Sequence, residues 1–376
     1  MSQAPVVLFG TLCHKPLLDL VAGKRLETQP AMLPDNRATW VQNRAWPMLV
    51  PERGAVAEGL LIRPGADTLA RLDFYEACFD YHRAPVEILV DGTVTQAQAW
   101  KPRHASGQPG ADWSLADWAR DWGPISVAAA AEVMRQLGRE DPRRVGARFG
   151  IIRSRAQSRL TTSAWHRPGH VGGQLTRADV ISHRAKHLHD GFFCAEDATV
   201  THRRFDGSVS GDVNRGVTTV ADAVTILPYD PVRDAILVVE QLRMGPLTHG
   251  DPAPWMLEPI AGMVDAGETA EQSGRREAIE EANLTLGEMH FIARYYPSPG
   301  GLGQVFFSYL AIADLPEDAT GTGGHPDEAE DIQSHIIPFD LAKRMLEEGD
   351  MANAVLIVSM QYLLLHRDRL RAAASG

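Results

Sequence analysis

The chain has 376 residues, of which 44% are hydrophobic and 23% charged, and a formal net charge of −11 at pH 7. This length predicts two or three domains, and the composition is that of a soluble globular protein. The acidic charge argues against a general nucleic-acid binder. The three cysteines, Cys13, Cys78 and Cys194, show no metal-ligand or disulfide spacing, so a reducing, cytoplasmic location is expected.

No apolar run approaches the length of a membrane span, so no membrane partner is expected. The first residues, MSQAPVVLFGTL, are expected to form a strand rather than a signal peptide. Up to about residue 101 the runs VVLFG, AVAEGLLIR and APVEILV indicate strands, and ADTLARLDFYEAC between them indicates a helix. This pattern is typical of a small α+β domain.

A helical stretch is expected next, starting at Gly123-Pro124 and ending at Gly138. The run RRVGARFGIIRSRAQSRL that follows is interpreted as a solvated helix face that links domains, with an anion-binding patch as the alternative. The Gly-rich stretch 167–174 is interpreted as a loop or linker. We therefore expect three parts: a first domain over 1–110, a helical and Arg-rich connecting region over 111–182, and a second domain over 183–376.

The second domain starts with a β-rich region near Gly191. There GFFCAEDATVTHRRF is expected to form two strands and FDGSVSGDV a turn, with further strands in TVADAVTILPYD and DAILVVEQLR. The remaining expected elements are a helix over 268–282, a strand over 304–313, and helices over 340–348 and 352–371.

The segment Glu258 to Leu284, EPIAGMVDAGETAEQSGRREAIEEANL, carries the chemistry. On a helix Glu277 and Glu281 share one face, which Glu280 borders. Like charges at this spacing destabilise an isolated helix, whereas a divalent cation needs several carboxylate oxygens. An ordinary acidic helix held by ion pairs is the alternative. The fixed order Gly262, Glu268, Arg276-Glu277 and Glu280-Glu281 favours a metal site.

The neighbouring residues fit that interpretation. Thr269 is well placed to cap the helix, and Arg276 is expected to hold one of the acids by a salt bridge. Gly262 and Gly267 permit tight turns and close approach of the backbone to a ligand. Asn283 is expected to end the helix in a left-handed cap.

This order of residues resembles the Nudix box, Gly-x5-Glu-x7-Arg-Glu-U-x-Glu-Glu-x-Gly-U, where U is a bulky aliphatic residue. Two positions depart from it: Ala278 is small, and Asn283 replaces the last Gly. From about residue 190, FDGSVSGDV, ILPYDPVRDAILVVEQLR, YYPSPGG and DEAEDI are similar to blocks of the bacterial ADP-ribose pyrophosphatases. The resemblance implies an αβα sandwich, Mg²⁺ with Mn²⁺ as an alternative, and a homodimer that swaps its N-terminal strands.

The same resemblance implies a role for individual residues. The metal ligands would be the backbone carbonyl of Ala261 and the carboxylates of Glu277, Glu281 and Glu330. Catalysis would use Glu328 as the general base, with Glu280 as the box acid that supports the ligands. The substrate would be bound by Arg215, Arg243 and Gln304.

Some of these residues depart from the family or allow another interpretation. Gln304 stands where the family can place a Glu that contacts the terminal ribose, and Gly216 replaces an acid after Arg215. Arg243 could be a surface cation. Glu328 and Glu330 could belong to an ordinary polar loop, although a Gly-rich loop with two acids suits a base carried on a lid.

The first domain carries a second candidate site. VVLFGTL places a Gly turn directly after a buried-type strand, where backbone N–H groups can receive an anion. In LDFYEACFDYHR, Glu76 stands in an apolar run near Tyr81 and Arg83, where burial can raise its pKa for proton transfer. These features resemble the γ-glutamylcyclotransferase-like (AIG2-like) family, a small β-barrel fold.

That resemblance implies that Glu76 is the acid/base and that the substrate loop is Phe9, Gly10, Thr11 and Leu12. Phe9 replaces a Tyr of the family, which removes a hydroxyl. The alternatives are a plain strand-turn, a Glu76 that is paired with an Arg, and a degenerate domain without activity.

The sequence therefore predicts a two-domain α+β and α/β protein that hydrolyses ADP-ribose to AMP and ribose 5-phosphate. One alternative substrate is another nucleoside diphosphate-linked compound, and an alternative of another class is a non-catalytic nucleotide-sugar sensor. The order of the two parts also resembles the Nudix proteins associated with bacterial tellurite resistance, although the sequence shows no metalloid-binding cluster.

Overall fold

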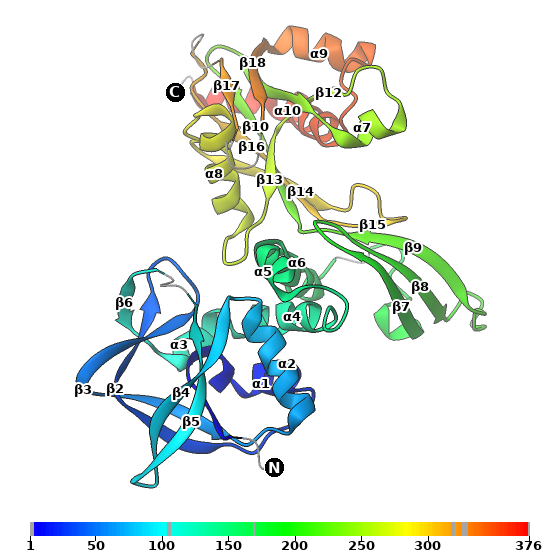
Figure 1. Cartoon of the computed structure of the whole chain (residues 1–376). Helices are drawn as coiled ribbons and strands as arrows, with labels where there is room; N and C mark the ends of the chain where they lie inside the picture. The colour runs from blue at the N-terminus through cyan, green and yellow to red at the C-terminus, as the bar shows by residue number, and fades with distance from the viewer. Residues whose placement is uncertain (1–3, 104–106, 168–169, 317–319, 325–329, 375–376) are drawn as a thin grey trace. The chain divides into compact units, whose positions relative to one another are not determined.

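The computed structural model describes residues 4–103, 107–167, 170–316, 320–324 and 330–374. The chain divides into two compact units, Met1–Leu160 and Thr161–Gly376 (Figure 1). Among the described residues no helix is both long and apolar enough to cross a bilayer.

The first unit is built on one sheet with helices packed against it. Within the described residues its strands are β1 Val6–Leu8, β2 Gln29–Val41, β3 Pro47–Ile62, β4 Tyr81–Val90, β5 Thr93–Pro102 and β6 Pro109–Asp112. Its helices are α1 Lys15–Ala22, α2 Ala66–Ala77, α3 Leu115–Asp121, α4 Gly123–Met134, α5 Pro142–Ala147 and α6 Phe149–Ser163.

The strands pair in the order β3-β1-β5-β4-β2-β6, and β2 also pairs with β3. These pairings connect five strands in a ring. However, β2 and β4 are bridged by one described residue pair, Met32 and Leu89. The barrel that the resemblance implies therefore stays a prediction.

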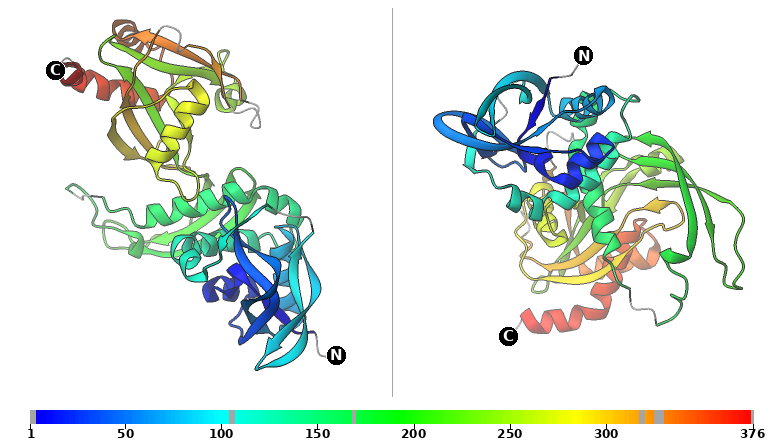
Figure 2. Two further views of the ribbon diagram at one scale, coloured as in Figure 1. Left: turned by 90° about the vertical axis from the view of Figure 1, so that its left-hand side faces the viewer. Right: turned by 90° about the horizontal axis from the view of Figure 1, so that it is seen from below.

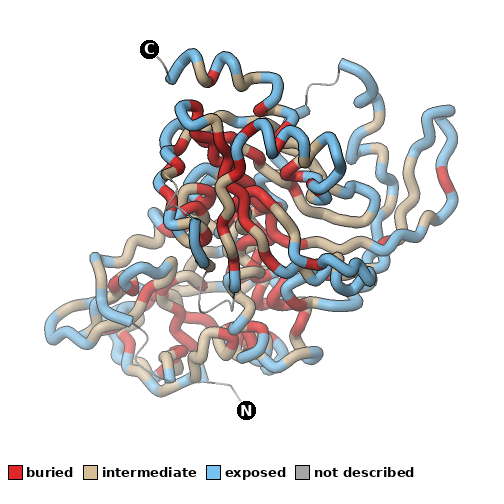
Figure 3. Tube along the Cα trace, turned by 90° about the horizontal axis from the view of Figure 1, so that it is seen from above, coloured by how far each residue is buried: buried red, intermediate tan, exposed pale blue. Residues whose placement is uncertain are grey.

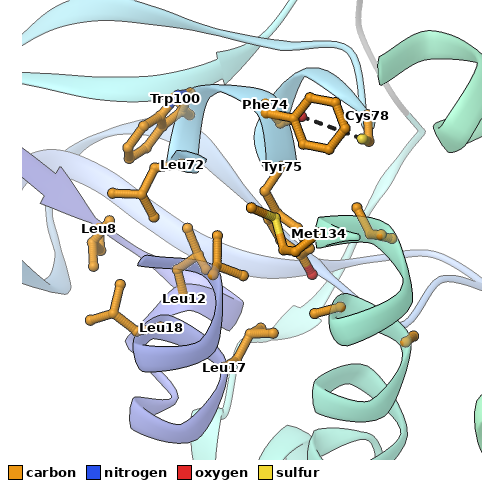
Figure 4. Close-up of a cluster of buried hydrophobic side chains, with 14 of the residues drawn as sticks. Leu8, Leu12, Leu17, Leu18, Leu72, Phe74, Tyr75, Cys78, Trp100 and Met134 are labelled. Atoms are coloured by element: carbon orange, nitrogen blue, oxygen red, sulfur yellow. Dashed lines mark hydrogen bonds between the residues drawn. The ribbon is translucent and has the colours of Figure 1, made fainter. Parts of the chain in front are cut away.

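The alternation of β1 separates two cores. Val6 and Leu8 pack with α1 and α2 in one cluster, part of which Figure 4 shows, whereas Val7 packs in a second cluster with Leu33 and Ile88. Helices α4 and α6 also contribute to the first cluster, which buries the side chain of Ile152.

The sequence predicts a first domain that ends at residue 110 and a connecting region over 111–182. In the structure the boundary between compact units falls after Leu160, because the helices after residue 114 bury apolar side chains in the first core. Whether 1–110 and 183–376 fold independently stays a prediction.

The Arg-rich run is not solvated throughout. Arg155 is 2% exposed and forms an ion pair with the fully buried Glu132, to which Arg159 also donates at 3.1 Å. A buried guanidinium is tolerated when a carboxylate pairs with it. The interpretation as a solvated face is therefore wrong for Arg155.

The second unit contains a larger and a smaller sheet. Within the described residues the larger sheet contains β10 Ala223–Asp230, β11 Ala235–Leu242, β12 Trp255–Glu258, β13 Ile260–Met263, β14 Met289–Tyr295, β16 Phe306–Ile312, β17 Thr322–Gly323 and β18 Ile332–Pro338. Its helices are α7 Met244–His249, α8 Ala270–Ala282, α9 Phe339–Glu348 and α10 Ala354–Ala374.

Helices cover both faces of this larger sheet. In β11, Leu237 and Val239 face the core that includes Ala278 of α8, while Ile236 and Val238 face the core beneath α9 and α10. Figure 2 shows α8 in yellow and α10 in red on opposite sides of the strands, and Figure 3 shows buried residues concentrated along them. The layers are therefore helix, sheet and helix.

The smaller sheet pairs β15 Leu302–Gly303, β9 Val213–Thr219, β8 Cys194–His202 and β7 Val180–Asp190 in that order. The sequence analysis missed β7 and expected two strands in 191–205, where the structure has β8 alone. The reason is that β7, VISHRAKHLHD, has no buried residue and no alternation of apolar side chains.

Candidate active site

Helix α8 positions the acidic residues as predicted. Its N-cap Thr269 accepts a hydrogen bond from the Gln272 N–H, and the Gln272 side chain accepts one from the Thr269 N–H. At the other end Asn283 takes the left-handed conformation, with φ 49°. These caps define a helix on which Glu277 and Glu281 share one face.

Glu281 is buried, with 2% of its surface exposed, and one carboxylate oxygen accepts a hydrogen bond from the Ala261 N–H at 3.3 Å. Burial raises the pKa of Glu281 to about 9, and the charge of Glu277 adds to the shift. Burial likewise raises the pKa of Glu277 to about 7, although Arg276 opposes the shift. A buried and a half-buried acid thus lie close enough to repel each other.

Arg276 connects Glu277 with the acids at the edge of this face. Its Nη1 donates to Glu277 and Glu280 at 2.9 Å each, and its Nη2 lies 3.3 Å from Glu268. Burial alone would lower the pKa of Arg276, but these three carboxylates raise it above its usual value. The salt bridge predicted for Arg276 is therefore confirmed, and Glu280 takes part in it.

Gly262 of β13 allows the backbone to lie directly against Glu277. A Cβ atom on Gly262 would lie 1.9 Å from Glu277 Oε1, so no side chain fits unless this carboxylate moves. The spacing of Gly262 and Glu277 in the Nudix-type motif thus has a steric cause.

The Gly-rich loop that carries Glu328 and Glu330 has its described ends, Gly323-Gly324 and Glu330, beside α8. A Cβ on Gly323 would lie 2.0 Å from the Glu281 carbonyl oxygen, and the Gly324 N–H donates to the Glu280 carbonyl at 3.1 Å. Glu330 lies against Gly324, and its charge contributes to the raised pKa values of Glu277 and Glu281. The predicted general base, Glu328, lies outside the described residues.

Arg243 follows the last residue of β11 and directly precedes α7. Its Nε and Nη2 donate to Glu258 at 2.8 and 2.5 Å. Burial alone would lower the pKa of Arg243, but Glu258, and then the charges of Glu281 and Glu330, raise it. The structure thus brings Arg243 near two of the predicted metal ligands.

The structure does not bring Arg215 or Gln304 into contact with this cluster. Arg215 lies on β9 in the smaller sheet and lines an open cavity of about 570 Å³ with Arg184 and Lys186. The Gln304 amide donates to the Ala221 carbonyl at 2.9 Å. Their assignment to substrate binding therefore stays a prediction.

The residues fit a divalent cation in donor type and charge. Glu277 and Glu281 offer hard oxygen donors, and a cation would neutralise their mutual repulsion. Within the described part of the chain no three His, Cys, Asp or Glu side chains are grouped closely enough to hold an ion by themselves. Arg276 pairs with Glu277 and Glu280, so further oxygens for a cation would come from other groups of the chain, from water or from bound substrate.

The candidate site of the first unit has the predicted turn. Phe9 precedes a short 3₁₀ helix, Gly10–Cys13, in which Gly10 has φ 76° and Leu12 is buried. Gly10 is needed there because of its positive φ and because a Cβ would lie 2.3 Å from Pro47. Thr11 follows it in the same turn.

Glu76 lies near the end of α2 and is half-buried. Burial raises its pKa to about 8, and the charge of Asp73 contributes. Among the described residues its carboxylate has no ion pair. Arg83 instead pairs with Asp73 at 2.8 Å, and the Trp100 indole N–H donates to the same oxygen at 3.0 Å. The alternative that Glu76 is paired with an Arg is therefore wrong for the part of the chain that the structure describes.

Comparison with known proteins matches each of the two parts of the chain to a family model. Residues 6–120 match the family model "Gamma-glutamyl cyclotransferase, AIG2-like", and residues 219–357 match the model "NUDIX domain". A crystal structure of an ADP compounds hydrolase covers 49% of this chain and 92% of that chain, at 19% identity and a TM-score of 0.37, which is too low to compare folds.

Curated relatives extend the assignment of the second part. An ADP-ribose pyrophosphatase of Escherichia coli K12 is 36% identical over 184 residues, 49% of this chain and 87% of the relative. One from Haemophilus influenzae is 32% identical over 49% of this chain and 85% of the relative. A GDP-mannose pyrophosphatase of Enterobacter sp. is 30% identical over 47% of this chain and 91% of the relative. The chain therefore belongs to the Nudix family and is a Nudix pyrophosphohydrolase that carries an AIG2-like γ-glutamyl cyclotransferase domain at its N-terminus.

Proposed function

We propose that this enzyme hydrolyses the pyrophosphate of ADP-ribose to AMP and ribose 5-phosphate with Mg²⁺, for which Mn²⁺ is an alternative. The buried Glu281 and the half-buried Glu277, beside Arg243 and Glu330, carry the proposal. They form an acidic site next to a guanidinium, which suits a cation and a pyrophosphate together. The two relatives named ADP-ribose pyrophosphatase, at 36% and 32% identity, favour this substrate.

In this proposal Glu277, Glu281, Glu330 and the Ala261 carbonyl would hold the cation, which would neutralise the pyrophosphate oxygens. Arg243 would bind the remaining anionic charge through its guanidinium. Glu328 would accept the proton of the attacking water as a P–O bond of the pyrophosphate breaks. Glu280 would keep Arg276, and through it Glu277, in place.

Two alternatives from the sequence analysis have different outcomes. A non-catalytic sensor is not retained, because the chain belongs to a family of enzymes. Another nucleoside diphosphate-linked substrate remains a second candidate, since the Enterobacter relative is a GDP-mannose pyrophosphatase.

A substrate panel tests the proposal. With Mg²⁺ present, and with AMP or GMP release as the readout, we expect kcat/KM for ADP-ribose to be at least about tenfold above that for GDP-mannose, because the relatives with the higher identity are ADP-ribose pyrophosphatases. Addition of a chelator should abolish turnover. A higher kcat/KM for GDP-mannose would favour the second candidate, and turnover of neither compound would contradict the proposal.

We further propose that the first unit is a γ-glutamyl-type cyclotransferase with Glu76 as acid/base. The half-buried carboxylate, which has no ion pair in the described part of the chain, supports this, whereas Phe9 in place of Tyr supports a degenerate site. Loss of the γ-amide bond in a panel of γ-glutamyl dipeptides would measure the activity. Activity in the wild type that Glu76→Gln abolishes would support the proposal, and its absence would favour the degenerate site.

Glu76→Gln also has an expected effect on stability. The folded-state pKa of about 8 lies above the ordinary value of 4.5, so folding favours the protonated acid. Glu76 makes its full contribution to the free energy of unfolding below pH 4.5, and this contribution is lost as the pH rises through about 8. We expect the Tm of Glu76→Gln to match wild type at pH 4 and to exceed it increasingly toward pH 8. A pH-independent difference in Tm would contradict the pKa, and ADP-ribose turnover should not change.

We propose that the protein is a cytoplasmic homodimer. Cys13, Cys78 and Cys194 form no disulfide among the described residues, which suits a reducing compartment. The smaller sheet and its turns expose large apolar side chains, which suit a second copy of the chain: Ile181, Leu188, Phe192 and Phe193. Light scattering at micromolar concentration should give twice the chain mass, and an active monomer would contradict the assembly.

A further inference from the structure

The buried carboxylate of Glu258 lies between Arg243 and Asn353. Its side chain is 6% exposed. One oxygen, Oε2, accepts from Nε and Nη2 of Arg243 at 2.8 and 2.5 Å, and the other, Oε1, accepts from Nδ2 of Asn353 at 2.9 Å. Both oxygens are thus satisfied by donors from opposite sides, as a buried carboxylate requires.

Asn353 is itself held by the start of α10. Its side-chain oxygen accepts hydrogen bonds from the N–H groups of Val355 and Leu356 at 3.0 and 3.2 Å. Leu356 is fully buried in the core beneath that helix. Asn353 therefore has a fixed orientation, with its amide directed at Glu258.

One nitrogen of the Arg243 guanidinium is not used by Glu258. Its side chain is 40% exposed, and among the described residues its Nη1 makes no hydrogen bond. Within its electrostatic reach lie the carboxylates of Glu281 and Glu330. An unrestrained guanidinium would be drawn to those carboxylates and would compete with a cation for them.

We propose that Glu258 and Asn353 are positioning residues that hold the Arg243 guanidinium for the substrate pyrophosphate and away from the metal-binding carboxylates. The proposal rests on the proposed function for the identity of the anion. Glu258 opens the motif segment but gave no signal in the sequence beyond its charge. Asn353 lies 95 residues after Glu258 in the chain, and no sequence pattern indicates that the two residues meet.

A purely structural ion pair would not require this arrangement. A structural pair gains most when the guanidinium is buried, as it is for Arg155, which is 2% exposed against 40% for Arg243. Here two nitrogens are fixed, which restricts the side chain to one orientation, and the third remains available. A bidentate guanidinium contact can thus form with little further loss of side-chain entropy.

Asn353→Ser is the sharpest test, because Ser caps a helix about as well as Asn but cannot donate to Glu258 across the same distance. We expect kcat/KM for ADP-ribose to fall about tenfold with Tm nearly unchanged, and Arg243→Ala to lower it roughly 100-fold. In the Arg243→Ala background, Asn353→Ser should then change kcat/KM less than about twofold. An equal effect of Asn353→Ser in both backgrounds, or no effect in the wild type, would overturn the proposal.

A crystal structure of Asn353→Ser without substrate separates this inference from the proposed function. We expect Glu258 to rotate and Arg243 to move toward Glu281 or Glu330. If Arg243 keeps its place, the positioning role is wrong even when ADP-ribose is the substrate. If Arg243 moves but wild-type protein does not hydrolyse ADP-ribose, the positioning role holds and the substrate assignment fails.

Discussion

Replacing Glu281 by Gln is expected to lower kcat for ADP-ribose by at least ~100-fold, about 2.7 kcal/mol in activation free energy. The neutral amide is a weaker ligand for a divalent cation than a carboxylate. Folding should not suffer, because Gln can still accept the hydrogen bond of the Ala261 N–H. It also removes a charge from a site that is 2% exposed, where burial disfavours the ionised form.

Steady-state AMP release and thermal unfolding of the same samples test both parts of this expectation. Mg²⁺ should raise the Tm of the wild type more than that of Glu281→Gln, since a bound ion stabilises the folded state. Glu271→Gln is the matched control: it lies on the same helix, is exposed and pairs with Arg275 at the surface. Near-wild-type turnover in Glu281→Gln would remove the metal assignment.

A methyl group on Gly262 is expected to cause a comparable loss without unfolding the protein. In Gly262→Ala the new Cβ would lie 1.9 Å from Glu277 Oε1 and 2.0 Å from its Cδ. These atoms are the flexible end of a side chain, so the carboxylate can move aside and the fold can persist. A displacement of about 1 Å at a reacting site can cost roughly 100-fold in rate.

Gly211→Ala is the control for this substitution, because a Cβ there meets nothing within 4 Å and φ is not positive at either position. We expect kcat to fall in Gly262→Ala alone, with similar Tm values for both variants and the wild type. Unchanged kcat in a folded Gly262→Ala would show that the position of Glu277 against β13 does not matter for turnover.

Local patterns predicted many of the elements correctly. The caps of α8, the short apolar strand β1 and the extent of α2 depend on neighbouring residues, so their positions follow from the chain itself. The missed strand β7 is a contrary case. Its polar side chains carry no periodic signal, and it is a strand because β8 supplies hydrogen-bond partners along its length.

Residues 277 and 281 of the candidate site could be predicted because a helix places i and i+4 on one face whatever surrounds it. The pairing of acids with cations from other elements could not be predicted. Arg83 lies seven residues from Glu76 but pairs with Asp73, since the hydrogen-bond pattern of β4 and β5 places it beside Trp100 and that acid.

By itself, then, the sequence determined the family, the helix that carries Glu277 and Glu281, and its two caps, because these depend on residue type at short spacing. The tertiary structure decided which side chains are buried and which partners they meet. Arg243, Glu258 and Asn353 come from three separate elements and meet only when β11, β12 and the start of α10 pack together. Their contact depends on the packing of the whole unit, which no local pattern of residues encodes.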